Sequence, residues 1–149
     1  NLKFKIPKIT SLILSLFILL YLFKFFSITP YQYTYLNFFN GNNENRYKKF
    51  ENDYWGSSIK ELIKGANFKS KSIIKIATCG INDKISKQYF KKRKDLIYKF
   101  VRSDEAEYII MTNRVINYNG LVNCFDRFKG NDVATVERNG LLLSVIRKI

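Results

Sequence analysis

The sequence predicts an α+β protein: one N-terminal transmembrane helix, then a small mixed α/β extracytoplasmic domain that ends in a β-hairpin. Three observations lead to this prediction. Residues 9–28 form an apolar run with a single charge. The later part of the chain alternates short β-branched runs with short helical patterns. Finally, Asn139-Gly140 separates two alternating apolar runs, which is the strongest short-range signal for a hairpin.

The apolar run has the length and pattern of a membrane span. Residues 9–23 carry no charge, and continuing through Lys24 to residue 28 gives roughly 30 Å of helix, enough to cross a hydrocarbon core. The run is apolar around its whole circumference, whereas a soluble core helix has a polar stripe. A cleavable signal peptide is the alternative, but no A-x-A-like site follows. We therefore predict a retained transmembrane helix over 9–28.

The flanking charges predict the orientation of this helix. Three cations, Lys3, Lys5 and Lys8, precede it, whereas after Lys24 the next cation is Arg46. By the positive-inside rule, residues 1–8 are a cytoplasmic flank and the chain after the span lies outside the cytoplasm. The expected location is the cell (inner) membrane, with the lipid bilayer as a partner and the C-terminal domain extracytoplasmic or periplasmic.

Residues 29–45 are expected to form an interfacial aromatic segment and a loop. Pro30 disfavours the helical conformation of Thr29 and so marks the end of the helix. The aromatic residues that follow are typical of a membrane-interface belt; they are Tyr31, Tyr33, Tyr35, Phe38 and Phe39. A solvent-side strand that alternates Tyr with polar residues is the alternative. The polar cluster 40–45 is predicted to form a loop.

Residues 46–149 are expected to form the small α/β domain. Ser58 and Glu61 have the spacing of a capping box. They precede an apolar face of helical period made by Ile59, Leu62, Ile63 and Ala66. A short basic helix is expected over 85–93. Strands are expected over 72–78, 96–101, 107–112, 133–138 and 141–147, the last two forming the hairpin.

The composition excludes several chemistries. The chain has 26 Lys plus Arg, 12 Asp plus Glu, no His and a formal net charge of +14. Having no His removes His-based triads and His-metal sites, so we expect no catalytic residues, no metal and no cofactor in this part. The charge invites a nucleic-acid interpretation. However, Lys outnumbers Arg 19 to 7, and the domain is expected outside the cytoplasm, so we expect no nucleic-acid partner.

Two local features leave alternatives open. Cys79 and Cys124 are 45 residues apart; they would be able to pair outside the cytoplasm, but spacing does not establish proximity, and buried free thiols are favoured. Glu51 and Asp53 lie close to Tyr54 and Trp55, a grouping found in sugar-binding clefts. The favoured interpretation is instead a capped helix entry with the indole in the core.

Two longer patterns resemble a known family. Residues 30–37 read PYQYTYLN, and residues 50–61 read FENDYWGSSIKE. In this order after a membrane span, they resemble the C-terminal end of bacterial multi-spanning glycosyltransferases of the GT-C type (glycosyltransferase family 39-like). These are similar to protein O-mannosyltransferases and lipid A aminoarabinose transferases. The closing stretch 138–147 fits the family's final hairpin more weakly, and Thr29 stands where the pattern frequently has His.

The resemblance implies a function for the parent chain, which would transfer a sugar from a polyprenyl-phosphate donor to an acceptor at the outer membrane face. Its catalytic acidic residues would lie in the first outward loop, upstream of this part, so none is assigned here. The implied partners are the upstream transmembrane part of the same chain and, through the parent, the lipid-linked sugar donor. Because the sequence starts with Asn1 rather than Met, we expect the reading frame to continue upstream.

The resemblance also implies supporting roles for eight residues. At headgroup level it places Tyr31, Gln32, Tyr35 and Asn37. At the interface between the domain and the membrane part it places Asp53, Tyr54, Trp55 and Gly56. The alternative function is a single-pass, membrane-anchored basic module that binds anionic lipid or an acidic polymer.

Overall fold

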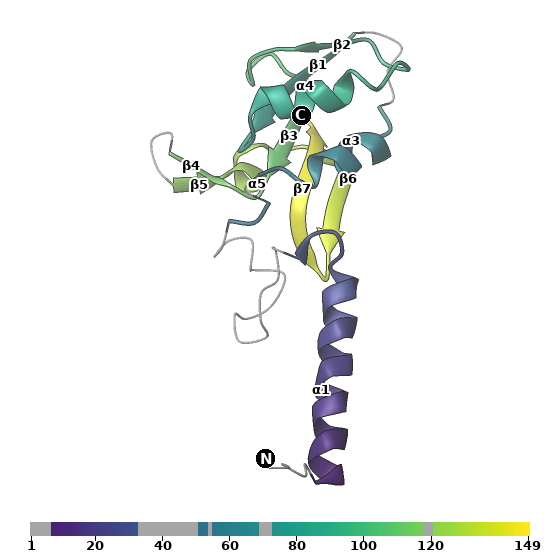
Figure 1. The fold of residues 1–149 in the computed structure, drawn as a ribbon. Coiled ribbons are helices and arrows are strands. Elements are labelled where there is room, and N and C mark those ends of the chain that lie inside the picture. Colours follow the sequence, from purple (N-terminus) through teal and green to yellow (C-terminus); the bar gives the residue numbers. More distant parts are fainter. Residues whose placement is uncertain (1–6, 33–50, 54, 69–72, 118–120) are drawn as a thin grey trace. The chain divides into compact units, whose positions relative to one another are not determined.

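The computed structural model describes residues 7–32, 51–53, 55–68, 73–117 and 121–149 (Figure 1). The chain divides into two compact units, Asn1–Tyr35 and Leu36–Ile149. The first unit contains the long apolar helix and the second contains a mixed α+β fold, in agreement with the predicted fold class.

The first unit is built on helix α1 (Lys8–Ser27), one residue offset from the predicted span. None of its residues is buried within the protein, and by length and composition it is able to cross a membrane. The helix ends as expected next to Pro30: the Thr29 amide donates to the Phe26 carbonyl at 3.2 Å. The Ser27 hydroxyl donates to the Lys24 carbonyl at 2.8 Å, which satisfies one of the last carbonyl groups of the helix.

The second unit is organised around a five-stranded mixed sheet in the part of the chain that the structure describes. Its strands, in spatial order, are β2 (Tyr98–Phe100), β1 (Ile74–Cys79), β3 (Tyr108–Thr112), β7 (Leu141–Lys148) and β6 (Asn131–Arg138). The first three strands are parallel, and β7 and β6 continue the sheet in antiparallel fashion. Helix α4 (Asp83–Phe90) connects β1 to β2, as a parallel pair requires a crossover.

One face of the sheet is covered by α4 and by α3 (Ile59–Gly65) (Figure 1). Helix α3 buries Ile59, Leu62 and Ile63, which is the apolar face predicted from their spacing. Phe90 of α4 places its ring 5.1 Å from Tyr98 and 5.7 Å from Phe100 on β2. Aromatic contacts of this geometry anchor the crossover helix on the edge strand.

The other face packs against helix α5 (Cys124–Arg127). Its core cluster includes Ala77, Cys79, Ala106, Ile109, Met111, Cys124, Phe125 and Val145. Helix α5 and the small hairpin of β4 (Val115–Asn117) and β5 (Leu121–Asn123) before it were not expected from the sequence. These elements are only three or four residues long, too short to show a periodicity.

The C-terminal hairpin is the expected element that the structure confirms most directly. Strands β6 and β7 pair in antiparallel fashion up to Arg138 and Leu141. Between them Asn139 has φ 56° and Gly140 has φ 75°, and positive φ at both central residues is what a type I′ turn requires. The remaining helices and strands lie within a few residues of their predicted bounds, because their apolar patterns follow the period of each element.

Candidate functional site

The segment 53–56 forms a tight turn at the entry to α3. The Gly56 amide donates to the Asp53 carbonyl at 2.8 Å, and the Ile59 amide donates to the Gly56 carbonyl at 3.2 Å. Asp53 and Gly56 both have positive φ, 53° and 66°. The positive φ favours glycine here, and a Cβ atom at Gly56 would lie 2.1 Å from Cδ1 of Ile81, so any larger residue would also displace that side chain.

The Asp53 carboxylate is buried and caps the start of α3. Its side chain is 1% exposed. Oδ1 accepts a hydrogen bond from the Ser57 amide at 2.7 Å, and Oδ2 accepts one from the Ser58 amide at 3.1 Å. The Ser58 hydroxyl also donates to Oδ2. Negative charge is favourable at a helix N-terminus, where amide groups have no partner within the helix.

The predicted capping box of Ser58 and Glu61 is wrong. The Ser58 side chain makes no cap hydrogen bond, because its hydroxyl bonds to Asp53 and, at 2.5 Å, to Oγ of Ser144 on β7. Glu61 does not reach back to the cap and is instead bound by Arg138 of the hairpin, at 2.7 and 2.8 Å. The cap is supplied by a carboxylate five residues upstream, and these tertiary contacts have no signature in the local sequence.

Trp55 is not in the core, which corrects the favoured interpretation of this segment. Its side chain is 75% exposed, because the turn points it away from the domain while Asp53 points inward. The sugar-cleft interpretation also loses one of its two carboxylates, since the Asp53 oxygens accept hydrogen bonds from the Ser57 and Ser58 amides, while Glu51 is exposed. What the structure presents is therefore an exposed indole on a turn fixed by buried hydrogen bonds.

Two of the predicted headgroup-level residues, Tyr31 and Gln32, lie in the described part of the first unit. Tyr31 is 3% exposed, and Nε2 of Gln32 donates to the Thr29 hydroxyl at 2.8 Å. A hollow of about 150 Å³ beside Lys24 is lined by Tyr21, Phe25, Ile28 and Gln32. Three other predicted residues, Tyr35, Asn37 and Tyr54, lie outside the described residues.

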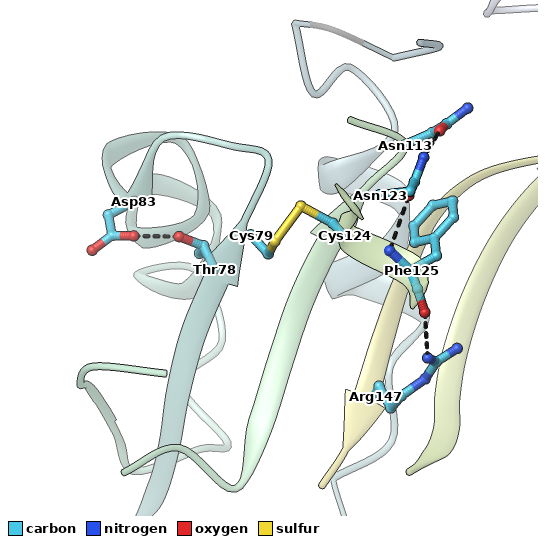
Figure 2. Close-up of a disulfide and its surroundings, with 8 residues drawn as sticks. All are labelled: Thr78, Cys79, Asp83, Asn113, Asn123, Cys124, Phe125 and Arg147. Carbon is cyan, nitrogen blue, oxygen red and sulfur yellow. Dashed lines mark hydrogen bonds between the residues drawn. A yellow bond between two sulfur atoms is a disulfide. The ribbon is translucent and has the colours of Figure 1, made fainter. Parts of the chain in front are cut away.

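Cys79 and Cys124 form a disulfide, so the favoured interpretation as free thiols is wrong (Figure 2). Their Cα atoms are 5.7 Å apart, within the usual range for a disulfide. Cys79 is the last residue of β1 and Cys124 is the first residue of α5. The packing of α5 on the sheet brings them together, and a separation of 45 residues along the chain does not reveal this.

A cleft of about 260 Å³ lies next to the disulfide, at the carboxyl end of β1. It is lined by residues 78–81 of the β1–α4 loop, by Ser103, and by Arg127 and Phe128 after α5. Ligands of open α/β sheets bind at such strand ends. The Thr78 hydroxyl, however, already donates to the Asp83 carboxylate (Figure 2). The cleft thus offers one guanidinium and few polar side chains.

Two arginines hold the domain together and were missed by the sequence analysis. Arg93 donates to the carbonyls of Ile63 and Ala66 at the end of α3, at 2.6 and 3.0 Å. It also binds Asp95 at 2.8 Å, and this hydrogen bond lowers the pKa of the Asp95 carboxyl below its ordinary value. Arg147 donates to the carbonyl of Phe125 at 2.8 Å (Figure 2), fixing α5 to β7.

The described residues contain no group of three or more acidic or sulfur ligands that would hold a metal ion. Searches of protein-family models, of curated proteins and of solved structures found no match to this chain.

Proposed function

We propose that this chain is the C-terminal end of an integral membrane glycosyltransferase that uses a polyprenyl-phosphate-linked sugar donor. It would contribute the last membrane span and a non-catalytic outer domain. The observation that carries the proposal is the order of parts: an apolar helix of 20 residues, the aromatic segment, and a separate α+β unit. The Asp53–Gly56 turn at the entry to α3 lies in the stretch that resembles the family.

Membrane anchoring is supported by α1. All residues of the helix are exposed, and leaving about twenty mostly apolar residues in water is strongly unfavourable. Lys24 lies in the last turn, where its stem would reach the headgroups of a bilayer that α1 spans. Lys3, Lys5 and Lys8 support a cytoplasmic N-terminus.

An extracytoplasmic position of the domain is further supported by the disulfide between Cys79 and Cys124. Disulfides form and persist in oxidising compartments and are rare in the cytosol. This observation is independent of the lysine count, and both favour the same side of the membrane.

The exposed Trp55 side chain is suited to a membrane–water interface. An exposed indole has a large apolar ring and one N–H donor, the combination that is enriched at membrane–water interfaces. We place the Trp55 ring at the membrane surface, where the domain meets the membrane part of the parent, with Asp53 and Gly56 fixing the turn that presents it. Tyr31, Gln32, Tyr35 and Asn37 would lie at headgroup level.

The chemistry would be supplied by the missing part of the parent. An acidic residue close to a span would act as the general base toward the acceptor, and cationic groups would compensate the charge of the departing lipid phosphate. We assign no catalytic role to Asp53, whose oxygens accept hydrogen bonds from the Ser57 and Ser58 amides.

The genomic sequence upstream of Asn1 tests the proposal. We expect the reading frame to continue through several further transmembrane helices, with an acidic residue near a span in the first outward loop. Changing that residue to its amide should abolish transfer from the lipid-linked donor and leave the domain folded. A frame that opens within about thirty codons, less than a second span with its loops would need, would contradict the glycosyltransferase.

The position of Trp55 is tested separately, because it is the single Trp of the chain. In proteoliposomes containing the full chain, brominated phosphatidylcholine should quench its fluorescence, and the emission should be shifted to shorter wavelength. The same chain in detergent with no brominated lipid is the control. Quenching by aqueous iodide alone would show that the indole does not contact the membrane.

A second candidate function is the single-pass, membrane-anchored basic binding module. The observation that favours it is the surplus of cations on the second unit, which the transferase proposal does not by itself explain. It predicts a gene that begins close to Asn1.

A further inference from the structure

The cations of the second unit are concentrated in one stretch. Residues 84–102 contain eight of the 26 Lys and Arg residues but one carboxylate, Asp95. Two of these cations, Lys87 and Arg102, form ion pairs with Asp83 and Asp104 just outside the stretch. Arg93 binds that carboxylate through three hydrogen bonds of 2.8–3.2 Å. Asp95 therefore neutralises Arg93 rather than the lysines around it.

Five exposed lysines gather at the end of the sheet where β1 and β2 begin. Lys75 of β1 and Lys99 of β2 are register partners, and both are exposed. Like charges on directly neighbouring strand positions repel each other. The exposed Lys91, Lys92 and Lys94 follow α4 and lead to the start of β2 at the same end of the sheet. We call these five lysines the basic rim.

Two exposed isoleucines lie beside the basic rim. Ile73 is 56% exposed and Ile97 is 67% exposed. They are next to each other, because the amide of Ile74 donates to the Ile97 carbonyl at 2.9 Å. By strand alternation they share a face with Lys75 and Lys99. The rim therefore combines positive charge with a small apolar contact area.

The basic rim lies at the opposite end of β1 from the Trp55 turn. Ile73 and Ile97 precede β1 and β2, whereas Gly56 packs against Ile81, which follows β1. The six residues of β1 span about 20 Å at 3.3 Å per residue. If the Trp55 turn contacts the membrane, the rim is directed away from it, and this geometry favours a soluble polyanion over the bilayer.

We propose that the basic rim binds the acceptor of the transfer reaction, and that this acceptor is an acidic polymer with repeated phosphate or carboxylate groups. The inference rests on the proposed function, since it needs the domain on the outer side of the membrane. Several lysines at one end of the sheet engage successive anionic groups of a chain at once. Such multivalent attraction raises affinity beyond that of one pair, and added salt weakens it.

The test uses the full chain in neutral detergent, with inorganic polyphosphate and poly-glutamate as two separate probes. We expect binding that weakens with salt, and the probe bound more tightly identifies phosphate or carboxylate as the preferred group. A triple variant, K91Q, K92Q and K94Q, should bind at least tenfold more weakly. The matched control is K60Q, K84Q and K87Q, which removes three exposed lysines of α3 and α4 outside the basic rim and should change affinity less than twofold.

Three results would overturn the proposal: no binding of either probe, equal losses in the two triple variants, or contact of the rim with lipid. The last is measured with a fluorescent label on I97C in proteoliposomes containing phosphatidylglycerol. Quenching of this label by brominated lipid would assign the rim to the bilayer. The Trp55 measurement and the upstream reading frame report on the proposed function independently, so failure of either proposal is distinguishable.

Discussion

Asp53 determines how the chain enters α3. Its backbone has positive φ, and its side chain satisfies two amide groups and one hydroxyl at the start of α3. Asp tolerates this backbone conformation better than most residues. The same residue therefore sets both the turn that exposes Trp55 and the first turn of the helix.

Removing this carboxylate should destabilise the domain. We expect Asp53→Ala to lower the free energy of unfolding by about 2–3 kcal/mol, because three hydrogen bonds to a charged group are lost and buried donors remain. Asp53→Asn keeps one acceptor oxygen and should cost less. Chemical denaturation followed by circular dichroism measures both. Glu105→Ala at an exposed position is the control, and an equal loss in that variant would refute the capping role.

At the scale of elements, the local sequence correctly predicted helix α3 and the C-terminal hairpin. The apolar spacing of Ile59, Leu62 and Ile63 identified α3, and Asn139-Gly140 identified the hairpin. The failures concern contacts between distant segments. Ser58 bonds to Ser144, 86 residues away, and Cys79 bonds to Cys124 across 45 residues. Nothing in the spacing of these residues encodes such contacts, because they arise when α3 and α5 pack on opposite faces of the sheet.

The hairpin turn makes a prediction of its own. Gly140 has φ 75°, a conformation that β-branched residues resist. We expect Gly140→Val to lower the free energy of unfolding by more than about 1 kcal/mol. Gly65 at the end of α3 has no atom within 4 Å of an added Cβ, so Gly65→Ala is the matched control and should be neutral or stabilising. Unchanged thermal midpoints in both variants would exclude strain at the turn.

For the whole molecule, the sequence analysis predicted the long apolar helix and the α+β class correctly. Of the candidate site it identified the segment 53–56 but misjudged the surroundings. It placed Trp55 in the core, whereas a turn with positive φ at Asp53 and Gly56 directs the indole outward. The orientation of a side chain on a turn depends on which neighbours cap the backbone, and composition and periodicity carry no information on this.

The sidedness of the whole chain can be tested with thiol chemistry, because the native cysteines are already paired. A reporter cysteine introduced as Asn42→Cys should react with a membrane-impermeant maleimide on intact cells. The physical reason is the lysine asymmetry around α1, which favours a cytoplasmic N-terminus. Labelling that appears only after lysis would reverse the topology.

The same labelling experiment reports on the disulfide, because it also measures whether Cys79 and Cys124 react with the maleimide. Cys79 and Cys124 should remain unlabelled after lysis and denaturation, and both should be labelled once a reductant has been added. An oxidising compartment is required for such a bond to form and persist, so outward labelling of residue 42 and protection of the cysteine pair should occur together. The unmodified chain, with no reporter cysteine, is the control for background labelling.

If residue 42 were accessible from outside while both native thiols were labelled without reduction, α5 would not be bonded to β1. The inference of an oxidising compartment would then rest on the lysine count alone.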